Sequence, residues 1–366
     1  MKDGILYVNG VEPNSSSQTL SGEIKDLFLK STDNLEWLSP GDVVLLKPAL
    51  NSPHPYPSTT HPLAMTVISK ILKEKGAKVV IGDQSGIKSV LHHPGGVIRG
   101  KTRDNYIKSR MGTEKDNFIS FEEEGWYEGF YHHKSTKTPS WRNGFYLTRW
   151  IEKADHIINL PRLSTHSQAG ATLGFKNMVG CLREDSRMEF HANGPYNFFI
   201  KADALGSSLK SVNDHTGTFI EKIVEINDAI RNKLRSTLFV ATKAQTTFGP
   251  DSQVLGIGRL KFAKAHVVNL EPGLVFASRD PVAAESFALA IIRHLRKSLP
   301  ALPRIYERLI LFLSNNAVKV DKLPIKEHPY IKHSMDIGLG EVASQIQYKN
   351  VPVALEKSLN ALLNRV

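Results

Sequence analysis

The stretches DVVLLKP (residues 42–48) and AKVVIGD (residues 77–83) decide the fold class. Each is a short apolar run rich in β-branched residues, which is typical of a buried strand. Between them, Pro62 stands at the favoured first position of a helix whose apolar residues recur on one face as far as Leu72. A strand, a helix and a strand within about 40 residues predict a βαβ unit with parallel strands and a right-handed crossover.

The same pattern continues along the chain. Residues 155–161 (DHIINLP), 237–242 and 266–270 predict further strands, and Asp280 followed by Pro281 predicts the start of a helix that runs to about residue 296. We therefore expect an α/β fold, with a mainly parallel central sheet and helices on both faces. The less regular stretch at about 87–150 predicts a peripheral insertion with a strand or two.

Length and composition limit the class of protein. The chain has 366 residues, of which 41% are hydrophobic and 23% charged, so it lacks the compositional extremes of disordered, collagenous or coiled-coil proteins. We expect an N-terminal lead-in over residues 1–40, one α/β domain over 41–345 and a helical tail over 346–366. Cys181 is the only cysteine, which excludes a disulfide framework, a cysteine zinc site and an iron–sulfur cluster held by this chain's own thiolates.

The ends of the chain and its charge bear on location and partners. The N-terminus lacks the pattern of a signal peptide, and no apolar run approaches the ~20 residues of a membrane span, so we expect a cytoplasmic protein. The net charge is +11, and residues 291–366 supply +6 of it, from 12 basic and 6 acidic residues. Nucleic acid or an anionic membrane would suit this charge, but the basic residues are scattered singly, which favours a solvated basic surface on a protein that handles small anions.

Polar side chains follow four of the predicted strands. Lys47 to Asn51 follow the first strand, Asp83 ends the second, Arg162 to His166 follow the third, and Thr242 and Lys243 end the fourth. In an open α/β sheet, ligands bind outside the carboxyl ends of the strands. The four ends together predict a ligand site.

Several motifs resemble, in order and spacing, the domain of unknown function 362 family over about residues 42–341. The most specific are residues 165–166 (TH) followed by 174–180 (GFKNMVG). The others are residues 47–48 (KP), 60–62 (THP), 82–83 (GD), 154–161 (ADHIINLP), 278–285 (SRDPVAAE) and 338–340 (GLG). Members are often joined to ferredoxin-like iron–sulfur segments or carry export signals, so the resemblance implies a redox partner protein.

The chain departs from this family in two places. Thr242 and Lys243 stand where members commonly carry Asp-Gly, and Glu285 and Ser286 stand where Asp-Ala is usual. A metal-binding or basic role of either acid in relatives would therefore not carry over unchanged.

The candidate catalytic residues are Lys176, His166 and Lys47. A lysine partly desolvated beside Arg162 and Lys47 would have a lowered pKa and could act as a base, while His166 transfers a proton. The alternative is a surface lysine followed by a helix-capping Asn177. Because we expect Lys176 outside the packed core, its replacement by alanine should change stability by less than ~1 kcal/mol.

The candidate ligand-binding residues surround that lysine. Thr59 and Thr60 precede the helix that begins at Pro62, and a helix N-terminus attracts anions, although Thr60 could simply cap it. Arg183, Asp185, Arg187 and His191 form a polar cluster after the Gly-rich segment. This cluster is either part of the site or a solvated loop. The ligand-binding set is Asn51, Thr59, Thr60, Asp83, Arg162, Asn177 and Arg187.

A divalent metal is a further possibility for the cofactor. His61, His166 and His191 supply three imidazoles, and Asp83 or Asp185 a carboxylate, which would suit such an ion. The alternative for His166 is a hydrogen-bonding or acid–base role without metal.

The sequence favours an enzyme that acts on a small carboxylate or phosphate through lysine and histidine acid–base chemistry. A non-catalytic ligand- or metal-binding protein that serves a redox system is the alternative, and a nucleic-acid binder is the third candidate.

Overall fold

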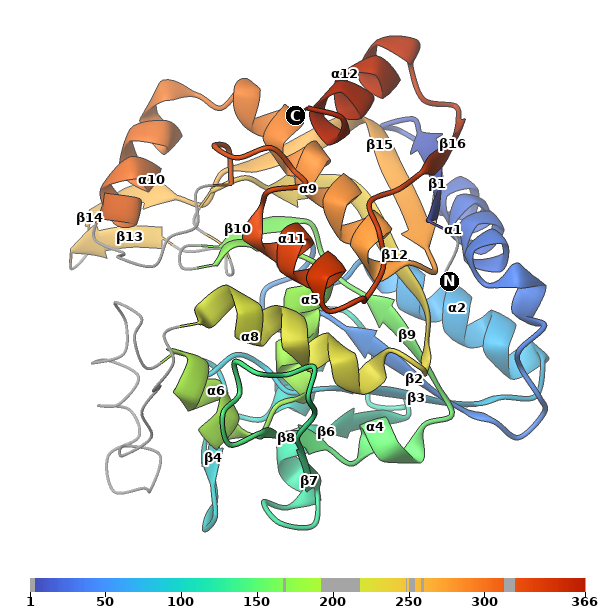
Figure 1. Ribbon diagram of the computed structural model, residues 1–366, viewed down its shortest axis with the longest axis vertical. Coiled ribbons are helices and arrows are strands. Elements are labelled where there is room, and N and C mark those ends of the chain that lie inside the picture. Colours follow the sequence, from blue (N-terminus) through green and yellow to red (C-terminus); the bar gives the residue numbers. More distant parts are fainter. Residues whose placement is uncertain are drawn as a thin grey trace.

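The computed structural model describes residues 4–166, 169–191, 218–247, 249, 254–257, 260–312 and 320–365. Its centre is a large, mostly parallel sheet with helices on both faces, so the predicted α/β class is confirmed (Figure 1). Only β15 runs antiparallel to both of its neighbours, β1 and β12. The strands lie in the order β16 (Gln345–Lys349), β1 (Ile5–Val11), β15 (Val267–Ser278), β12 (Leu234–Gln245), β9 (His156–Leu160), β2 (Val43–Pro48), β3 (Lys78–Asp83) and β6 (Phe118–Ser120).

The predicted βαβ unit is confirmed as β2, α2 (Pro62–Glu74) and β3, with parallel strands. Successive side chains of β2 point to opposite faces of the sheet, so this strand contributes to two hydrophobic cores. Val44 and Leu46 pack into the cluster that includes α1 (Ser17–Ser31) and α2, whereas Leu45 packs into the cluster on the opposite face. Because both faces are covered, the strand is a continuous apolar run rather than an alternating one.

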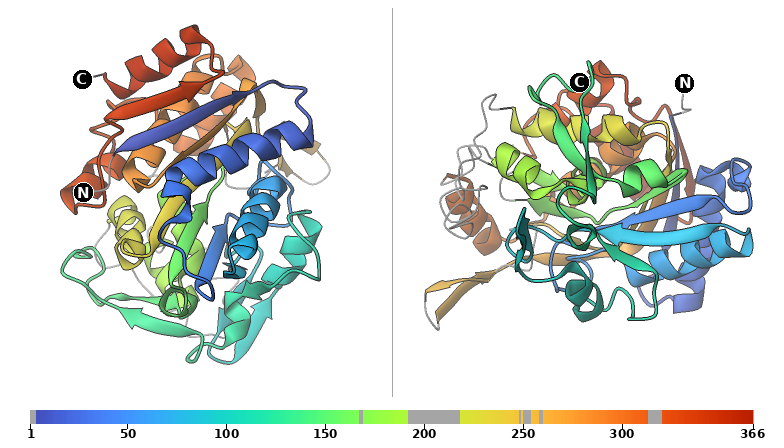
Figure 2. Two further views of the ribbon diagram at one scale, coloured as in Figure 1. Left: turned by 90° about the vertical axis from the view of Figure 1, so that its right-hand side faces the viewer. Right: turned by 90° about the horizontal axis from the view of Figure 1, so that it is seen from below.

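The helices divide between the two faces. In Figure 1, α1 and α2 lie to the right of the strands, and α5, α8, α9 and α11 lie on the other side; Figure 2 shows α1 and α2 from their own side. Asp280 caps α9 through Val282 N–H and Ala283 N–H, as predicted. The helices that pack into the core of the second face are α5 (Gly174–Asn177), α8 (Phe219–Glu225), α9 (Pro281–Lys297), α11 (Pro329–Asp336) and α12 (Val353–Leu363). Two further helices are α6 (Glu184–His191), which contacts α8, and α10 (Ala301–Phe312), which contacts β14.

The predicted insertion at about 87–150 is peripheral only in part, because β6 joins the central sheet beside β3. The rest lies at the lower edge of Figure 1. The sheet also takes β1 from residues before Gly41, and β16 pairs with β1 near the C-terminus. The peripheral elements are β4 (Leu91–His93), β5 (Gly96–Arg99), α3 (Thr102–Lys108), β7 (Phe130–His133), β8 (Phe145–Thr148) and α4 (Trp150–Lys153).

Two smaller pairs of strands remain. The short strands β10 (Ser164–His166) and β11 (Gly170–Thr172) follow β9 and lie beside the end of β12. A hairpin of β13 (Val254–Ile257) and β14 (Leu260–Lys264) stands apart from the central sheet. Within the described residues, no helix has the length and apolar composition that crossing a membrane requires.

Candidate functional site

The site lies where the chain changes direction in the sheet, between β2 and β9. After β2 the chain continues through α2 on one face to β3, whereas after β9 it continues through α5 on the other face. The carboxyl ends of β2 and β9 are adjacent, with Lys47 opposite Asn159 in the register. Two strands whose following helices lie on opposite faces leave a crevice between their ends, which is where open α/β sheets bind ligands.

Asn177 holds α5 over this crevice. Its Nδ2 donates to the Lys47 carbonyl at 3.0 Å and to Asn159 Oδ1 at 2.8 Å. Asn159 in turn donates to the Gly174 carbonyl at 3.1 Å, which fixes the first residue of α5. Both amide protons of Asn177 are thus used inside the protein, and Asn177 also lines the pocket described below.

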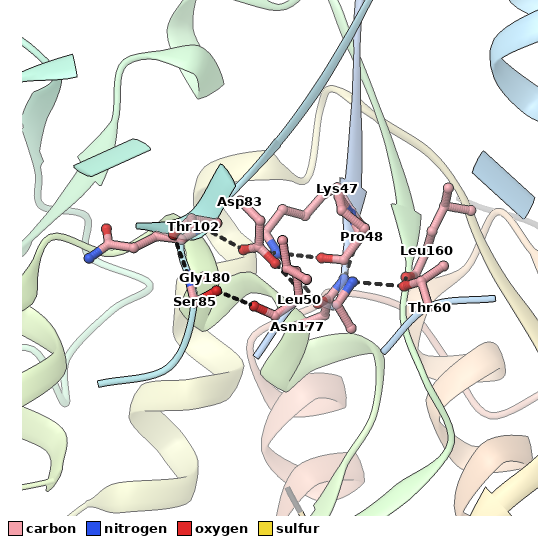
Figure 3. Close-up of polar contacts among 12 residues, drawn as sticks. Lys47, Pro48, Leu50, Thr60, Asp83, Ser85, Thr102, Leu160, Asn177 and Gly180 are labelled. Carbon is pink, nitrogen blue, oxygen red and sulfur yellow. Dashed lines mark hydrogen bonds and ion pairs between the residues drawn. The ribbon is translucent and has the colours of Figure 1, made fainter. Parts of the chain in front are cut away.

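Lys47 and Asp83 form a buried ion pair beneath the crevice (Figure 3). The distance from Lys47 Nζ to Asp83 Oδ1 is 2.7 Å, and Nζ also donates to the Pro48 carbonyl at 2.7 Å. Asp83 accepts hydrogen bonds from the backbone N–H groups of Leu50 and Gln84, each at 2.8 Å. Both charges are therefore compensated, and Lys47 does not line the pocket described next.

Gly180 covers this ion pair. A Cβ atom at that position would lie 2.0 Å from Asp83 Oδ1 and 2.7 Å from Lys47 Nζ, so any side chain would displace the pair. Gly180 ends the motif at residues 174–180, but the reason for a glycine there lies in residues far away in the chain.

A small pocket of about 60 Å³ opens above the pair, and four basic side chains line it. They are Lys176 from α5, Arg187 from α6, and Arg162 and His166 from the segment after β9. Among the described lining residues the only carboxylate is Asp83, which is already paired with Lys47. The pocket therefore carries an excess of positive charge.

Lys176 has a strongly lowered pKa. Its side chain is only 8% exposed, and burial, together with the charges of Arg162 and Arg187, lowers its pKa to about 7. A lysine in this state exchanges its proton near neutral pH. The expectation that Lys176 lies outside the packed core is wrong, because α5 points it into the protein interior.

Both arginines are held in place by backbone carbonyl oxygens. Arg187 donates to the carbonyls of Leu182, Ser85, Gln84 and Gly180 at 2.6–3.1 Å, and Arg162 donates to the Ser58 carbonyl. A neutral carbonyl group fixes a guanidinium group without adding a negative charge of its own. Such an arrangement is suited to attract an anion.

His166 and His191 are both neutral near neutral pH. Burial, reinforced by the charge of Lys176, lowers the pKa of His166 well below its usual value, and the pKa of His191 falls to about 3 for the same two reasons. His166 Nδ1 accepts the Ala169 N–H at 3.1 Å, so the neutral ring carries its proton on Nε2. In this form His166 can donate a hydrogen bond through Nε2.

The structure does not assemble the predicted three-histidine metal site. His61 caps α2, with Nδ1 accepting from the Leu63 N–H at 3.2 Å, and does not line the pocket with His166. Asp185 is engaged by Arg183 through two hydrogen bonds of 3.0 and 2.7 Å. Among the residues that the structure describes, no three His, Cys, Asp or Glu side chains are placed to hold a metal ion.

The remaining predicted ligand-binding residues divide into two groups. Asn51 lines the pocket, close to Gly86. Thr60 is not the helix cap, because its hydroxyl accepts from the Ala49 N–H at 2.7 Å and donates to the Leu160 carbonyl, which ties the loop to β9. Thr59 is buried but does not line the pocket. Thr60 therefore stabilises the loop after β2, whereas the buried Thr59 hydroxyl has no hydrogen-bond partner among the described residues.

A family model with the description "Domain of unknown function (DUF362)" matches residues 44–290, which include every pocket residue named above. The chain belongs to the DUF362 family. A thylakoid-associated protein from Synechocystis sp. is 28% identical over 158 residues, or 42% of this chain. The chain spans 44% of that relative's length. No solved structure matches the chain significantly.

Glu285, one departure from the family pattern, lies next to the start of α5. Its Oε2 accepts the Phe175 N–H at 3.1 Å and so holds the start of α5. Burial raises the pKa of Glu285 to about 8, although hydrogen bonds from Phe175 and Gly174 partly oppose this shift. The sequence marked this position as a departure from DUF362, but not as a support for Lys176.

The raised pKa of Glu285 predicts a loss of stability as pH rises. Glu285 stays protonated in the folded protein up to about pH 8 but ionises near its usual pKa of 4.5 when unfolded. Between these pH values the folded state binds more protons, so the unfolding free energy should fall by up to about 4 kcal/mol from pH 5 to 8. Glu285→Gln, which keeps a carbonyl acceptor for the Phe175 N–H, should flatten this dependence in urea denaturation. Equal pH slopes in both proteins would contradict the assignment.

The other DUF362 departure, Thr242 and Lys243, lies within β12 rather than at its end. The Tyr56 hydroxyl, from the loop after β2, accepts the Lys243 N–H at 2.7 Å and lies 3.1 Å from the Thr242 hydroxyl. These residues dock that loop onto β12. They do not line the small pocket.

Proposed function

We propose that the protein binds a small anion, a carboxylate or a phosphate-like group, in the pocket between β2 and β9. The observation that carries this proposal is the pocket's charge: Lys176, Arg162 and Arg187 face it, and its only described carboxylate is bound to Lys47. A group of cations gathered around one pocket attracts an anion.

The chemistry that suits this site is proton transfer by Lys176. With a pKa of about 7, the amine is half neutral at physiological pH and can accept a proton from a bound acid. Arg162 and Arg187 would hold the anion, and His166 Nε2 would donate a hydrogen bond to it. Lys47 and Asn177 act by positioning, since their polar groups are engaged inside the protein.

The experiment measures proton uptake during anion binding. Isothermal titration calorimetry with sulfate and with acetate, in buffers of different ionisation enthalpy, reports the number of protons taken up. At pH 8 most Lys176 amines are neutral, and a bound anion favours the ammonium form, so uptake should approach one proton per site. At pH 6 the amine is already protonated, and uptake should be near zero.

Lys176→Met and the exposed Lys70→Met serve as the matched pair of variants. The first should lose anion binding, and the second should bind and take up protons as the unmodified protein does. Anion binding without pH-dependent uptake would remove Lys176 from the chemistry. If neither sulfate nor acetate binds to the unmodified protein, the proposed function is overturned.

A further inference from the structure

A second, much larger pocket of about 860 Å³ lies between the end of α9, α10, residues 320–322 and the end of α12. Six cationic side chains line it in addition to Arg296, and we call it the basic pocket. They are Arg293, Lys297, Arg304, Arg308, Lys322 and Arg365. These residues belong to the basic C-terminal part of the chain, for which the small pocket provides no explanation.

The two acids of the basic pocket do not neutralise these six cations. Glu307 and Asp321 both bind Arg296, each with an oxygen 2.8 Å from Nη2. Within the part of the chain that the structure describes, none of the six other cations lies in an ion pair with a carboxylate. The cluster of Arg296 with two carboxylates has a net charge of −1, so the seven cations and two acids leave 7 − 2 = +5 on the described lining residues.

Arg293 supplies the pocket with a buried guanidinium group that could bind a ligand. Its side chain is only 7% exposed, and its Nε donates to the Val320 carbonyl at 2.6 Å. Its Nη2 is buried and has no hydrogen-bond partner among the described residues. A buried guanidinium nitrogen without an acceptor is costly, so an acceptor oxygen from a ligand would stabilise it.

We propose that the basic pocket binds a small molecule that carries two or more linked phosphate groups. Four of the six uncompensated cations are arginines, whose planar forks match phosphate oxygens in pairs. The volume is that of a site for a whole small molecule rather than for one monatomic ion. Multiple cations call for a ligand with several negative charges.

His166 connects this pocket with the site between β2 and β9. It lines both the small pocket and the basic pocket. A phosphate chain in the basic pocket would therefore lie next to the small pocket that Lys176 lines. The proposal itself is argued from the residues of the basic pocket alone.

The test uses pyrophosphate and two charge-reversal variants. Arg308→Glu with Lys322→Glu changes two exposed cations of the pocket, and Lys25→Glu with Lys115→Glu makes the same charge change at exposed positions elsewhere. We expect saturable calorimetric binding of pyrophosphate that weakens with salt. The pocket variant should weaken it about tenfold or more, and the control variant less than about twofold.

The proposal would be overturned by the absence of saturable pyrophosphate binding, by equal weakening in the two charge-reversal variants, or by no weakening in the pocket variant. Lys176→Met separates this proposal from the proposed function. It should abolish sulfate binding in the small pocket and leave pyrophosphate binding in the basic pocket within about twofold. Loss of pyrophosphate binding in Lys176→Met would place that ligand in the small pocket and overturn the basic pocket as its site.

Discussion

Lys176→Met should make the protein more stable by about 3–5 kcal/mol at pH 6, although it removes anion binding. The pKa of Lys176 falls from 10.5 to about 7 on folding, because the ammonium group is buried beside Arg162 and Arg187. Below pH 7 the folded protein bears the full cost of that buried charge. Between pH 7 and 10.5 the unfolded chain binds more protons, so the protein gains stability as pH rises. The advantage of the methionine variant should therefore shrink over that range.

Urea denaturation at pH 6, 7.5 and 9 measures this effect. Lys222→Met is the matched control, because Lys222 is equally buried but lies 2.8 Å from Glu189 Oε1. Removing that lysine should destabilise the protein at each pH. If Lys176→Met is destabilising at pH 6, the cluster of cations is compensated and the anion site loses its physical basis.

Asp83→Asn should have the largest effect in the opposite direction. Asp83 accepts the Leu50 N–H through Oδ2 and the Gln84 N–H through Oδ1, so asparagine keeps one of these two acceptors. It also leaves the Lys47 ammonium group buried without its counter-charge. Breaking one side of a buried ion pair costs about 3–5 kcal/mol. The expected result is a corresponding fall in the unfolding free energy, measured by urea denaturation.

The double variant Lys47→Met with Asp83→Asn tests the reason for that fall. It removes both charges, so it should recover a substantial part of the lost stability. Glu74→Gln, in the exposed pair with Lys70, should cause no measurable change. If the double variant is no more stable than Asp83→Asn, packing rather than the unpaired Lys47 charge controls the fall in the unfolding free energy.

Local patterns predicted the elements that their own residues determine. The apolar runs of β2, β3 and β9, the proline at the start of α2 and the Asp280 cap of α9 all depend on neighbouring residues, and the structure has them. The antiparallel course of β15 and the inclusion of β1 and β16 depend on pairing between distant segments, which no local period encodes.

The same division explains the candidate site. Strand ends and the family motif pointed to Lys176, Arg162 and His166, and the structure brings them to one pocket. The sequence did not reveal that Lys47 is bound by Asp83, that His61 caps α2, or that Gly180 must lack a side chain. Each of these depends on a specific contact geometry rather than on residue type.

The hydrogen bond from Asn177 to the Lys47 carbonyl joins residues 130 positions apart. The Lys47–Asp83 pair, in contrast, can form as soon as the first βαβ unit is complete. Contacts over long separations close late in folding, because the chain entropy of a long loop must be overcome first. The competence to bind an anion should accordingly be among the last properties that a refolding molecule acquires. The fraction of molecules that take up a proton with sulfate would then count those that have completed folding.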